Sequence, residues 1–323
     1  MPNFTLNFSV MANFNPDVGG ERYRSFIADM NSLNLEVDYP VENDQSFDNL
    51  KYYDCKELNS ANSSLNFNFS VFHLNISSLS RHFDELKTLL SLLDFNFSVI
   101  GITESRFLKH SPPIFDFNID GYSVEQTPTE SSAGGALLYV SNRFSYIPRS
   151  DLSQAMYMPG HLESVFVEIS FSRKSNLLIG CVYRHPGMSV DLFNSDFLSP
   201  LLQTTGRENK SIVLLGDFNI NLLKYDNPGV STFLDTLGSY FLAPQIVLPT
   251  RITETSKTLI DNIFSNITEC SVSGNLLYSI SDHLAHFFVF RFLRLVILVQ
   301  TGLILLETGQ NFTRNIFCVI LKL

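Results

Sequence analysis

Acidic and amide side chains recur in this sequence just after short apolar runs. The run SIVLLG leads into Asp217 and Asn219, VIGIT is followed by Glu104, and FHL is followed by Asn75. Gly, Asp and Asn also form ordinary turns, so any one of these positions alone predicts only a turn. Several carboxylates and amides at strand ends could instead meet at one edge of a sheet and bind a metal ion or a phosphate.

The same arrangement recurs later in the chain and adds a phenol and an imidazole. Tyr183 and Arg184 end the run NLLIGCVY, Asp261 precedes an apolar pair, and Asp282 and His283 stand just before AHFFVF. Each position has an ordinary interpretation, because Tyr-Arg can be an edge pair and Asp-His dipeptides are common. Together they offer oxygen ligands, an imidazole and a hydroxyl donor, which suits chemistry on a phosphate.

Apolar periodicity predicts the elements that would position these side chains. Strands are expected over 69–74, 97–102, 134–140, 163–170, 176–183, 211–216 and 285–290, and helices over 80–95, 190–203 and 231–241. The strands between residues 134 and 183 follow one another in a group, which argues against a regular βαβ repeat. The pattern therefore predicts an α/β sandwich with mixed sheets.

The two ends of the chain differ from this central part. Residues 1–64 contain ten acidic and four basic residues with little periodicity, which predicts an acidic, weakly ordered leader. Residues 293–323 include the apolar run LRLVILVQTGLILL, which is shorter than the roughly 20 residues that a membrane span needs. We expect a domain over 65–292 and then an apolar tail, either a further buried segment or a stretch outside the domain. Membrane association is not expected.

Composition limits the classes of function. The chain has 323 residues, 45% of them hydrophobic, which is enough for a substantial core. Its net charge of −10 argues against a general nucleic-acid coat protein but allows a nuclease, because DNA needs only a local basic face. The four cysteines show no C-x-x-C spacing, so neither a disulfide framework nor a zinc site is expected. The N-terminus lacks a signal-peptide pattern, so we expect an intracellular protein, nuclear or cytoplasmic, that is not secreted.

Taken together, the polar strand ends resemble the endonuclease/exonuclease/phosphatase superfamily over about residues 66–291. The residues that carry the resemblance, in order, are Leu74-Asn75-Ile76, Thr103-Glu104, Tyr183-Arg184, Gly216-Asp217-Phe218-Asn219, Ile260-Asp261-Asn262 and Ser281-Asp282-His283. The resemblance implies a four-layer α/β/β/α sandwich, DNase I-like, with two mixed β-sheets. The segments GGALLYVSNR, VYRHP and LPTRIT are similar to the endonuclease domain of non-LTR (LINE-type) retrotransposons.

This resemblance implies Mg²⁺-dependent hydrolysis of phosphodiesters, with Mn²⁺ as a second possible metal and DNA as the partner. No obligate protein partner is expected. Glu104 is the expected metal ligand, with Asn75 and Asp282 near it. Asp217 is expected to orient or deprotonate the water, or to protonate the leaving oxygen.

The remaining site residues are expected to contact the phosphate. Asn219, His283 and Tyr183 would donate hydrogen bonds to it, and Asp261 would accept the other ring proton of His283. Arg184 and Arg251 are the expected substrate-binding cations, although a surface salt bridge explains Arg184 equally well.

Some positions depart from the retrotransposon pattern. Ser77 stands where arginine is usual, Ser105-Arg106-Phe107 replaces the usual Trp-Leu, and His185 stands where proline is common. His185 is expected to be a loop residue, and His73 a packed core histidine. Two other functions stay open: a phosphatase or phospholipase of the same fold, and a catalytically silent remnant of a mobile element.

Overall fold

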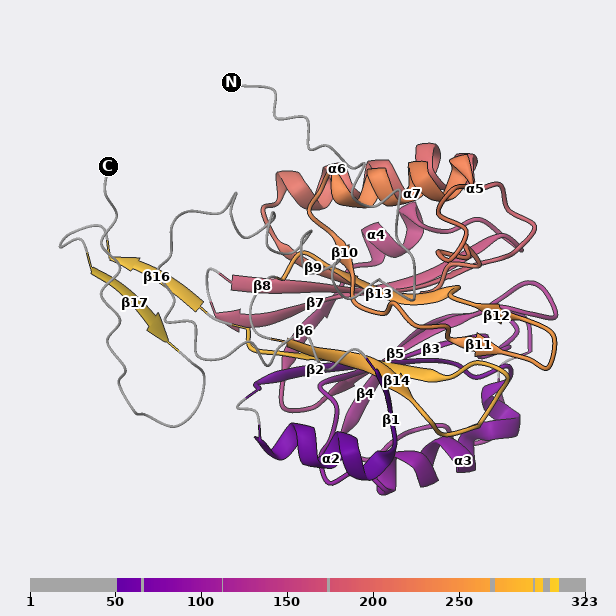
Figure 1. The fold of residues 1–323 in the computed structure, drawn as a ribbon, viewed down its shortest axis with the longest axis horizontal. Coiled ribbons are helices and arrows are strands. Elements are labelled where there is room, and N and C mark those ends of the chain that lie inside the picture. Colours follow the sequence, from indigo (N-terminus) through magenta and orange to yellow (C-terminus); the bar gives the residue numbers. More distant parts are fainter. Residues whose placement is uncertain are drawn as a thin grey trace.

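The computed structural model describes residues 51–64, 67–111, 113–172, 175–267, 271–292, 294–298 and 303–307. Two β-sheets lie face to face, and helices cover the outer side of each sheet, so that the elements form four layers (Figure 1). Both sheets contain parallel and antiparallel pairs. The predicted α/β/β/α sandwich with two mixed β-sheets is therefore confirmed.

The first sheet has seven strands among the described residues. Their order is β1 (Lys51–Tyr53), β14 (Ser271–Leu276), β15 (Ala285–Phe290), β2 (Phe69–Asn75), β3 (Val99–Thr103), β5 (Ala136–Ser141) and β4 (Tyr122–Thr127). The pairs β1–β14 and β2–β3 are parallel, and the other neighbours are antiparallel. Helices α2 (Cys55–Ser64) and α3 (Leu79–Ser91) cover the outer face of this sheet (Figure 1).

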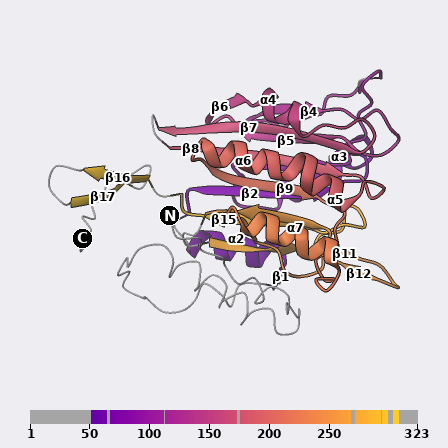
Figure 2. The ribbon, with the colours of Figure 1, turned by 90° about the horizontal axis from the view of Figure 1, so that it is seen from above.

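The second sheet has six strands in the described part of the chain. Their order is β10 (Ala243–Pro244), β13 (Asp261–Ser265), β9 (Ser211–Asp217), β8 (Ser175–Arg184), β7 (Leu162–Ser172) and β6 (Ser145–Pro148). Only β8 and β9 pair in parallel among these neighbours. Its outer face carries α4 (Ser150–Ala155), α5 (Val190–Leu192), the π-helix η2 (Phe193–Leu198), α6 (Ser199–Arg207) and α7 (Pro228–Gly238), and Figure 2 shows α6 and α7 above the sheet.

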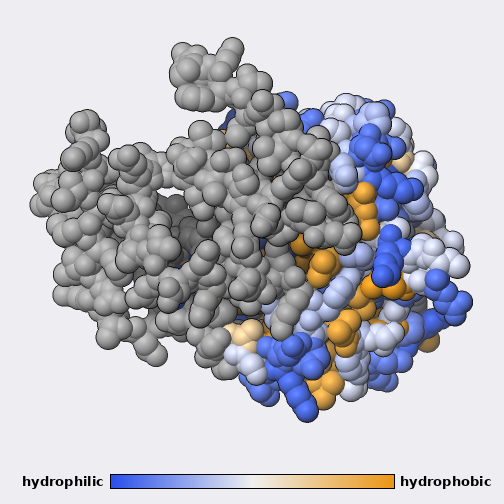
Figure 3. Space-filling model, in the orientation of Figure 1, coloured by the Kyte–Doolittle hydropathy of each residue, from blue (hydrophilic) through white to orange (hydrophobic). Residues whose placement is uncertain are grey.

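Three apolar clusters fill the spaces between the four layers. Strand β2 shows why, because successive side chains of a strand point to opposite faces. Phe69 and Val71 pack between the two sheets, whereas Phe72 and Leu74 pack in the cluster with the residues of α3. On the coloured part of the surface in Figure 3, apolar residues lie in small groups between polar ones. Strands buried on both faces explain the continuous apolar runs in the sequence.

The predicted elements match the structure where the apolar pattern is strong. The predicted strands correspond to β2, β3, β5, β7, β8, β9 and β15, and the predicted helices to α3, the run from α5 to α6, and α7. The strands β4, β6, β13 and β14 were not predicted from the sequence. Strands β4 and β6 lie at sheet edges and are only partly buried, and β14 (SVSGNL) has few apolar residues.

The predicted leader differs from the structure over residues 51–64. This segment forms β1 and α2, and Tyr53 and Leu58 are buried in the core cluster beneath the first sheet. The ring of Tyr53 meets that of Phe287 edge to face at 5.2 Å. Because this segment contains many polar residues, its sequence did not indicate the strand and the helix. Both elements are stabilised by contacts with distant parts of the chain. The rest of the predicted leader, residues 1–50, lies outside the described residues.

The described parts of the tail form a hairpin. Strand β16 (Arg294–Leu298) pairs antiparallel with β17 (Leu303–Glu307), and these two make a separate sheet. A second small hairpin, β11 (Arg251–Ile252) with β12 (Lys257–Thr258), lies before β13. No helix in the described ranges is long and apolar enough to cross a membrane. The remaining tail residues lie outside the described part.

Candidate active site

Strand pairing brings the predicted polar residues of both sheets to one edge of the sandwich. In the first sheet, Asn75 ends β2 and Glu104 follows the neighbouring parallel strand β3. In the second sheet, Tyr183 on β8 pairs in register with Asp217 on β9. Asp217 in turn lies opposite Asp261, the first residue of the antiparallel β13. The sequence predicted these positions as strand ends, and the sheet register explains why they meet.

Gly216 lets the chain leave β9 at this edge. Its φ is +156°, and a Cβ atom built on it would lie 1.9 Å from the carbonyl oxygen of Val182 on the neighbouring strand. The next turn is fixed by Asp217, whose Oδ1 accepts the backbone N–H of Asn219 at 2.9 Å. Asn219 has a φ of +49°, in the left-handed region that asparagine tolerates better than most residues. The Gly-Asp-Phe-Asn segment thus leaves the strand with Asp217 held at the edge by its bond to Asn219.

The Asn75 amide connects the two sheets. Its Nδ2 donates to Asp217 Oδ2 at 2.8 Å and to Glu104 Oε1 at 3.1 Å. The Tyr183 hydroxyl donates to the same Glu104 oxygen at 3.2 Å. Asn75 and Asp217 are each 1% exposed, so these contacts are shielded from water. Four of the predicted site residues therefore form one hydrogen-bonded group.

A buried acid–imidazole pair lies beside this group. Asp261 accepts a hydrogen bond from His283 Nδ1, at 2.8 Å to Oδ2 and 3.0 Å to Oδ1. The Thr250 hydroxyl donates to Asp261 Oδ2 at 2.7 Å. The Ser281 hydroxyl accepts the N–H of His283 at 3.1 Å and donates to the Asn75 carbonyl at 2.6 Å. Because the Nδ1–H group of His283 donates its hydrogen bond to Asp261, the Nε2 atom of His283 is left for a substrate.

Burial and charge shift the pKa values of three of these groups. Burial and the charge of Asp261 raise the pKa of Asp217 above its ordinary value. Burial alone would lower the pKa of His283, but the Asp261 carboxylate outweighs it and raises that pKa to about 9. Burial, with the charge of Glu104, raises the pKa of Tyr183 well above that of a free phenol. At neutral pH the site therefore offers two proton donors beside an unusually basic carboxylate.

Two groups of residues could be considered for a metal ion. Asp217, Asp261 and His283 place potential ligand atoms within 4.8 Å of one another. In this group Nδ1 of His283 already donates to Asp261, so these two residues are engaged with each other. Glu104 and Asn75 fit Mg²⁺ better, because this ion prefers oxygen ligands and retains several waters. The side chain of Glu104 is 14% exposed, so its carboxylate can be reached from solvent.

The structure corrects the prediction of a surface salt bridge for Arg184. Its side chain is buried, and its guanidinium donates to backbone carbonyls: Phe218 at 2.5 Å, Asn219 at 2.7 Å, His185 at 3.3 Å, and Met188. Burial lowers its pKa to about 10. Arg184 therefore holds the loop after β9 in place, with its guanidinium buried and bound to the backbone instead of forming a surface salt bridge. Backbone carbonyls of a sharp turn need a buried hydrogen-bond donor, and this requirement could have indicated the role of Arg184 from the sequence.

Asn219 and Asp282 are also engaged within the protein. Asn219 Nδ2 donates to the Arg184 carbonyl at 2.8 Å, so its predicted bond to phosphate stays a prediction. Asp282 accepts from Arg251 at 2.8 Å from Nε and 2.7 Å from Nη2. Both side chains of this pair are more than 40% exposed, and no hydrogen bond in the described residues joins Asp282 to Glu104 or Asn75. The predicted metal role of Asp282 and substrate role of Arg251 stay predictions.

Sequence reasoning missed a second acid–imidazole pair next to Tyr183. Glu163 on β7 is fully buried and pairs in register with Tyr183. Its Oε2 lies 2.8 Å from His185 Nε2, and its Oε1 accepts from the Thr129 hydroxyl at 2.9 Å. The rings of His185 and Tyr183 meet edge to face, with their centroids 4.7 Å apart. His185 thus lies in a loop, as predicted, but is buried against the site.

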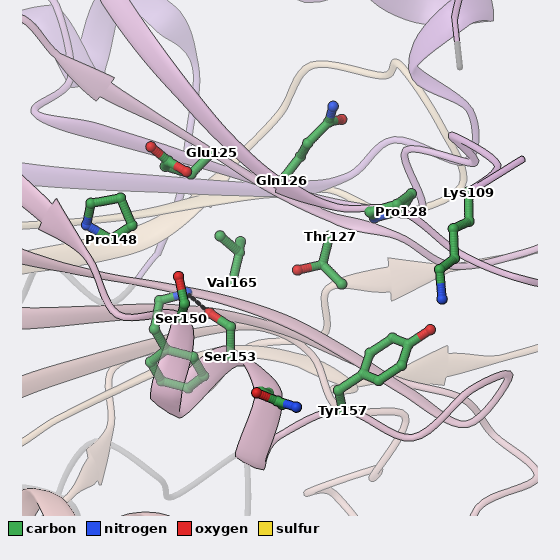
Figure 4. Close-up of a pocket in the computed structure, with 12 residues that line it drawn as sticks. Lys109, Glu125, Gln126, Thr127, Pro128, Pro148, Ser150, Ser153, Tyr157 and Val165 are labelled. Carbon is green, nitrogen blue, oxygen red and sulfur yellow. Dashed lines mark hydrogen bonds between the residues drawn. The ribbon is translucent and has the colours of Figure 1, made fainter. Parts of the chain in front are cut away.

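His73 and a separate cavity are not part of the group of predicted site residues at this edge. His73 is a buried core residue, as predicted, and bonds to His286 at 3.1 Å and to Thr103 at 3.0 Å. A cavity of about 390 Å³ opens between β4, α4 and β7, where Thr127, Tyr157 and Lys109 line it (Figure 4). None of the predicted site residues lines this cavity.

Solved structures with the same fold are nucleases and related proteins. The endonuclease domain of TRAS1, described as a telomere-specific non-LTR retrotransposon, aligns with a TM-score of 0.50 and 17% identity over 69% of this chain and 98% of that one. An AP endonuclease from Leishmania major aligns with a TM-score of 0.59 and 12% identity over 81% and 98%. An endonuclease/exonuclease/phosphatase family protein from Leptotrichia buccalis aligns with 0.50 and 14% over 70% and 100%. No family model and no curated sequence matches the chain.

These likenesses show the fold of the endonuclease/exonuclease/phosphatase superfamily in this chain. The fold implied by the sequence resemblance is therefore confirmed.

Proposed function

We propose that this protein hydrolyses phosphodiesters with Mg²⁺ and nicks DNA as a retrotransposon-type endonuclease. The observation that supports this most is the linked group at the catalytic edge. There, Asn75 joins Glu104 to Asp217, and Asp261 holds His283 beside them. Such a group combines an oxygen ligand, a proton acceptor and two proton donors around one point. Hydrolysis of a phosphate diester needs these three functions together.

Glu104 and Asn75 would hold the metal ion in this proposal. When bound, Mg²⁺ would neutralise charge on the phosphate and favour ionisation of water. The oxygens of Glu104 are kept in position by Asn75 and Tyr183, which donate to Oε1. Mn²⁺ prefers similar oxygen ligands and would be expected to substitute.

Asp217 would take the proton of the attacking water. Its raised pKa makes the carboxylate more basic than an ordinary aspartate, and an efficient base has a pKa close to the working pH. The N–H groups of Asn75 and Asn219 fix its two oxygens, so that it cannot turn away. The same group, once protonated, could return its proton to the leaving oxygen.

His283 and Tyr183 would stabilise negative charge on the phosphate. The Nε2–H of a protonated His283 is a charged donor, and hydrogen bonds from charged donors are roughly twice as strong as neutral ones. The raised pKa of Tyr183 keeps its phenol protonated, so it stays a donor over the whole working range. Asp261 fixes the ring of His283 without contacting the substrate.

The DNA substrate is supported by the retrotransposon-like segments GGALLYVSNR and VYRHP. A DNA substrate would place the protein inside the cell. A phosphatase or phospholipase of this fold would use the same edge on a different substrate, and a silent remnant would have no activity.

The test is conversion of supercoiled plasmid to open circles with Mg²⁺ and with EDTA. We expect nicking only with the metal, and 3′-hydroxyl ends that a polymerase extends. Asp217→Ala should lower the rate by about 10²-fold or more, whereas Arg81→Gln on the exposed face of α3 should not. Hydrolysis of inositol phosphates or sphingomyelin in place of DNA would favour the phosphatase or phospholipase. Equal nicking rates for folded wild-type protein and Asp217→Ala would favour the catalytically silent remnant.

We also propose that the catalytic unit spans about residues 51–292 and that the tail 293–323 is dispensable. Support comes from the burial of Tyr53 and Leu58 and from Asn68, whose side chain bonds the backbone of Phe292 at both N–H and carbonyl. Deleting residues 1–50 should leave the melting temperature and nicking unchanged, whereas deleting 1–64 should lower both. If the two truncated proteins have equal melting temperatures and nicking rates, the catalytic unit begins after residue 64, as predicted from the sequence. A truncation after residue 292 that is less soluble than the full chain would make the tail part of the fold.

A further inference from the structure

Arg106 is bound to the carboxylate that the proposed function assigns to the metal. Its Nη2 lies 2.7 Å and its Nε 3.2 Å from Glu104 Oε2, the oxygen that Asn75 and Tyr183 leave free. Nη2 also donates to the Ser77 hydroxyl at 3.0 Å. A metal ion and this guanidinium would therefore bind the same oxygen.

The backbone holds Arg106 and Glu104 on the same side of the chain. Both residues have positive φ values, +51° for Glu104 and +56° for Arg106, a conformation that non-glycine residues rarely adopt. Backbone bonds keep the turn in place: the Arg106 N–H donates to the Gly134 carbonyl at 2.9 Å, and the Glu104 carbonyl accepts from Ser78 at 2.9 Å. A strained turn that is fixed from both sides indicates that the direction of these two side chains matters.

The guanidinium of Arg106 also contacts Ser77. Where the retrotransposon pattern usually has arginine, this chain has Ser77, and the Ser77 hydroxyl receives the guanidinium of Arg106 from the neighbouring strand end. The Arg106 side chain is 33% exposed, and its Nη1 donates no hydrogen bond within the described ranges. One donor of the guanidinium is thus available at the mouth of the site.

We propose that Arg106 is a switching cation, which competes with the metal for Glu104 and turns to the DNA phosphate when the metal binds. The competition stands on the Arg106–Glu104 contact alone, whereas the phosphate contact rests on the proposed function. An arginine fork suits this role, because it binds a carboxylate or a phosphate in the same geometry. The consequence is that Arg106 weakens the binding of metal but strengthens the binding of DNA to the metal-loaded protein.

The test measures the two ligands separately, without relying on catalysis. Calorimetry gives the Mn²⁺ affinity of wild-type protein, of Arg106→Gln, and of Arg81→Gln, which removes the same charge from the exposed face of α3. Fluorescence anisotropy gives the affinity for a DNA duplex with Mn²⁺ present, with Asp217→Asn in every variant to prevent cleavage. Circular dichroism confirms that each variant is folded. Ser77→Ala, which removes only one contact of the guanidinium, is the milder second variant.

Arg106→Gln should tighten Mn²⁺ binding by about fivefold or more, the usual size of a coupling between two sites, and should weaken DNA binding by a similar factor. Ser77→Ala should tighten Mn²⁺ binding by a smaller factor, and Arg81→Gln should change neither. Unchanged or weaker Mn²⁺ binding by Arg106→Gln would overturn the competition, and unchanged DNA binding would overturn the switch. If wild-type protein neither nicks nor binds DNA, while Arg106→Gln still tightens Mn²⁺, the competition is supported and the proposed function fails.

Discussion

Two buried acid–imidazole pairs lie at the candidate site, one among the predicted site residues and one beside them. They are built from the same kinds of residues. In each pair a carboxylate accepts from a threonine hydroxyl and holds one ring nitrogen of a histidine at 2.8 Å. Asp261 holds His283 by Nδ1, whereas Glu163 holds His185 by Nε2. We call the first the central pair and the second the flanking pair.

The surroundings of the two pairs differ more than their chemistry. The central pair shares its space with Asp217, and potential ligand atoms of the three residues lie within 4.8 Å of one another. The flanking pair lies behind the ring of Tyr183 and beneath Gly134. The comparison teaches that the surroundings of a buried acid–imidazole pair, and not the pair itself, separate these two as candidates for catalysis. What distinguishes the central pair is a second carboxylate, that of Asp217, within 4.8 Å of the ligand atoms of the pair.

The largest expected difference is in activity. His283→Ala should lower the rate of plasmid nicking by about 10²-fold or more, because it removes a charged donor to the phosphate. His185→Ala should lower it by about tenfold or less, equivalent to ~1.4 kcal/mol of barrier, since it acts only through the packing of Tyr183. Both variants should be compared at equal folded fraction. A loss with His185→Ala as large as with His283→Ala would make the two pairs equivalent.

The second difference is in the dependence of stability on pH. The pKa of His283 is raised to about 9 from an ordinary value of 6.5, so its stabilisation is fully present below about pH 6.5 and is lost as the pH rises through about 9. Asp217, whose pKa is also raised, acts in the same direction. We expect the free energy of unfolding to fall by a few kcal/mol between pH 6.5 and 9, because each tenfold difference in proton affinity between the folded and unfolded states is worth about 1.4 kcal/mol.

Urea unfolding at several pH values measures this decline. His283→Gln should flatten it, because the titrating group of the central pair is gone. An equal flattening by His185→Gln would show that the decline does not belong to the central pair.

The third difference concerns packing, which should matter more for the flanking pair. A Cβ atom on Gly134 would lie 2.8 Å from Glu163 Oε2 and 2.9 Å from His185 Nε2, at a φ of +110°. Gly134→Ala should therefore cost about 1–2 kcal/mol for the backbone and about 1–3 kcal/mol more for overpacking. Gly121, at a φ of +82° with no atom within 4 Å, is the matched control and should cost only the first amount. Equal melting temperatures for the two alanine variants would mean that the flanking pair is loosely packed.

The contrast between the pairs also shows what the sequence could predict. Asn75 and Asp217 were predicted as strand-end polar residues because a long apolar run precedes each of them. Glu163 was not, because it lies inside the run LESVFVEI and its partner is fixed only by the register of β7 with β8. Pairings across strands depend on register, and a single sequence does not determine register.

The arginines show the same limit at the site itself. Arg184, predicted at the substrate, is buried among backbone carbonyls, and Arg106, not predicted, is bound to Glu104. Both outcomes depend on how tight turns from different strands meet. The sequence indicates the turns, through Gly216 and the residues around Glu104, but it does not indicate which long side chain enters which turn.

The smallest expected difference comes from the two threonines. The Thr250 hydroxyl donates to Asp261 at 2.7 Å, and the Thr129 hydroxyl donates to Glu163 at 2.9 Å. Replacing either by valine keeps the shape of the side chain but removes its hydrogen bond to a buried carboxylate, which should cost about 1.5 kcal/mol of stability or more. Thr250 also loses its bond from the Asp261 N–H, and Thr129 loses its bonds with the Ala133 carbonyl and the Ser131 N–H. Activity should separate them. Thr250→Val keeps Asp261, the partner of His283, but leaves it free to shift, so nicking should fall by about tenfold, the lower end of what loss of an outer hydrogen-bond partner costs.

Thr129→Val should leave nicking within about twofold, because the proposed mechanism gives the flanking pair no contact with the phosphate; a change this small corresponds to less than ~0.5 kcal/mol of barrier. Thermal unfolding and initial nicking rates of the two variants, measured on the same preparations, provide the test. If the two valine variants lose activity in proportion to their loss of stability, then Thr250 only supports the fold, and the central pair needs no support from its threonine to act on a phosphate.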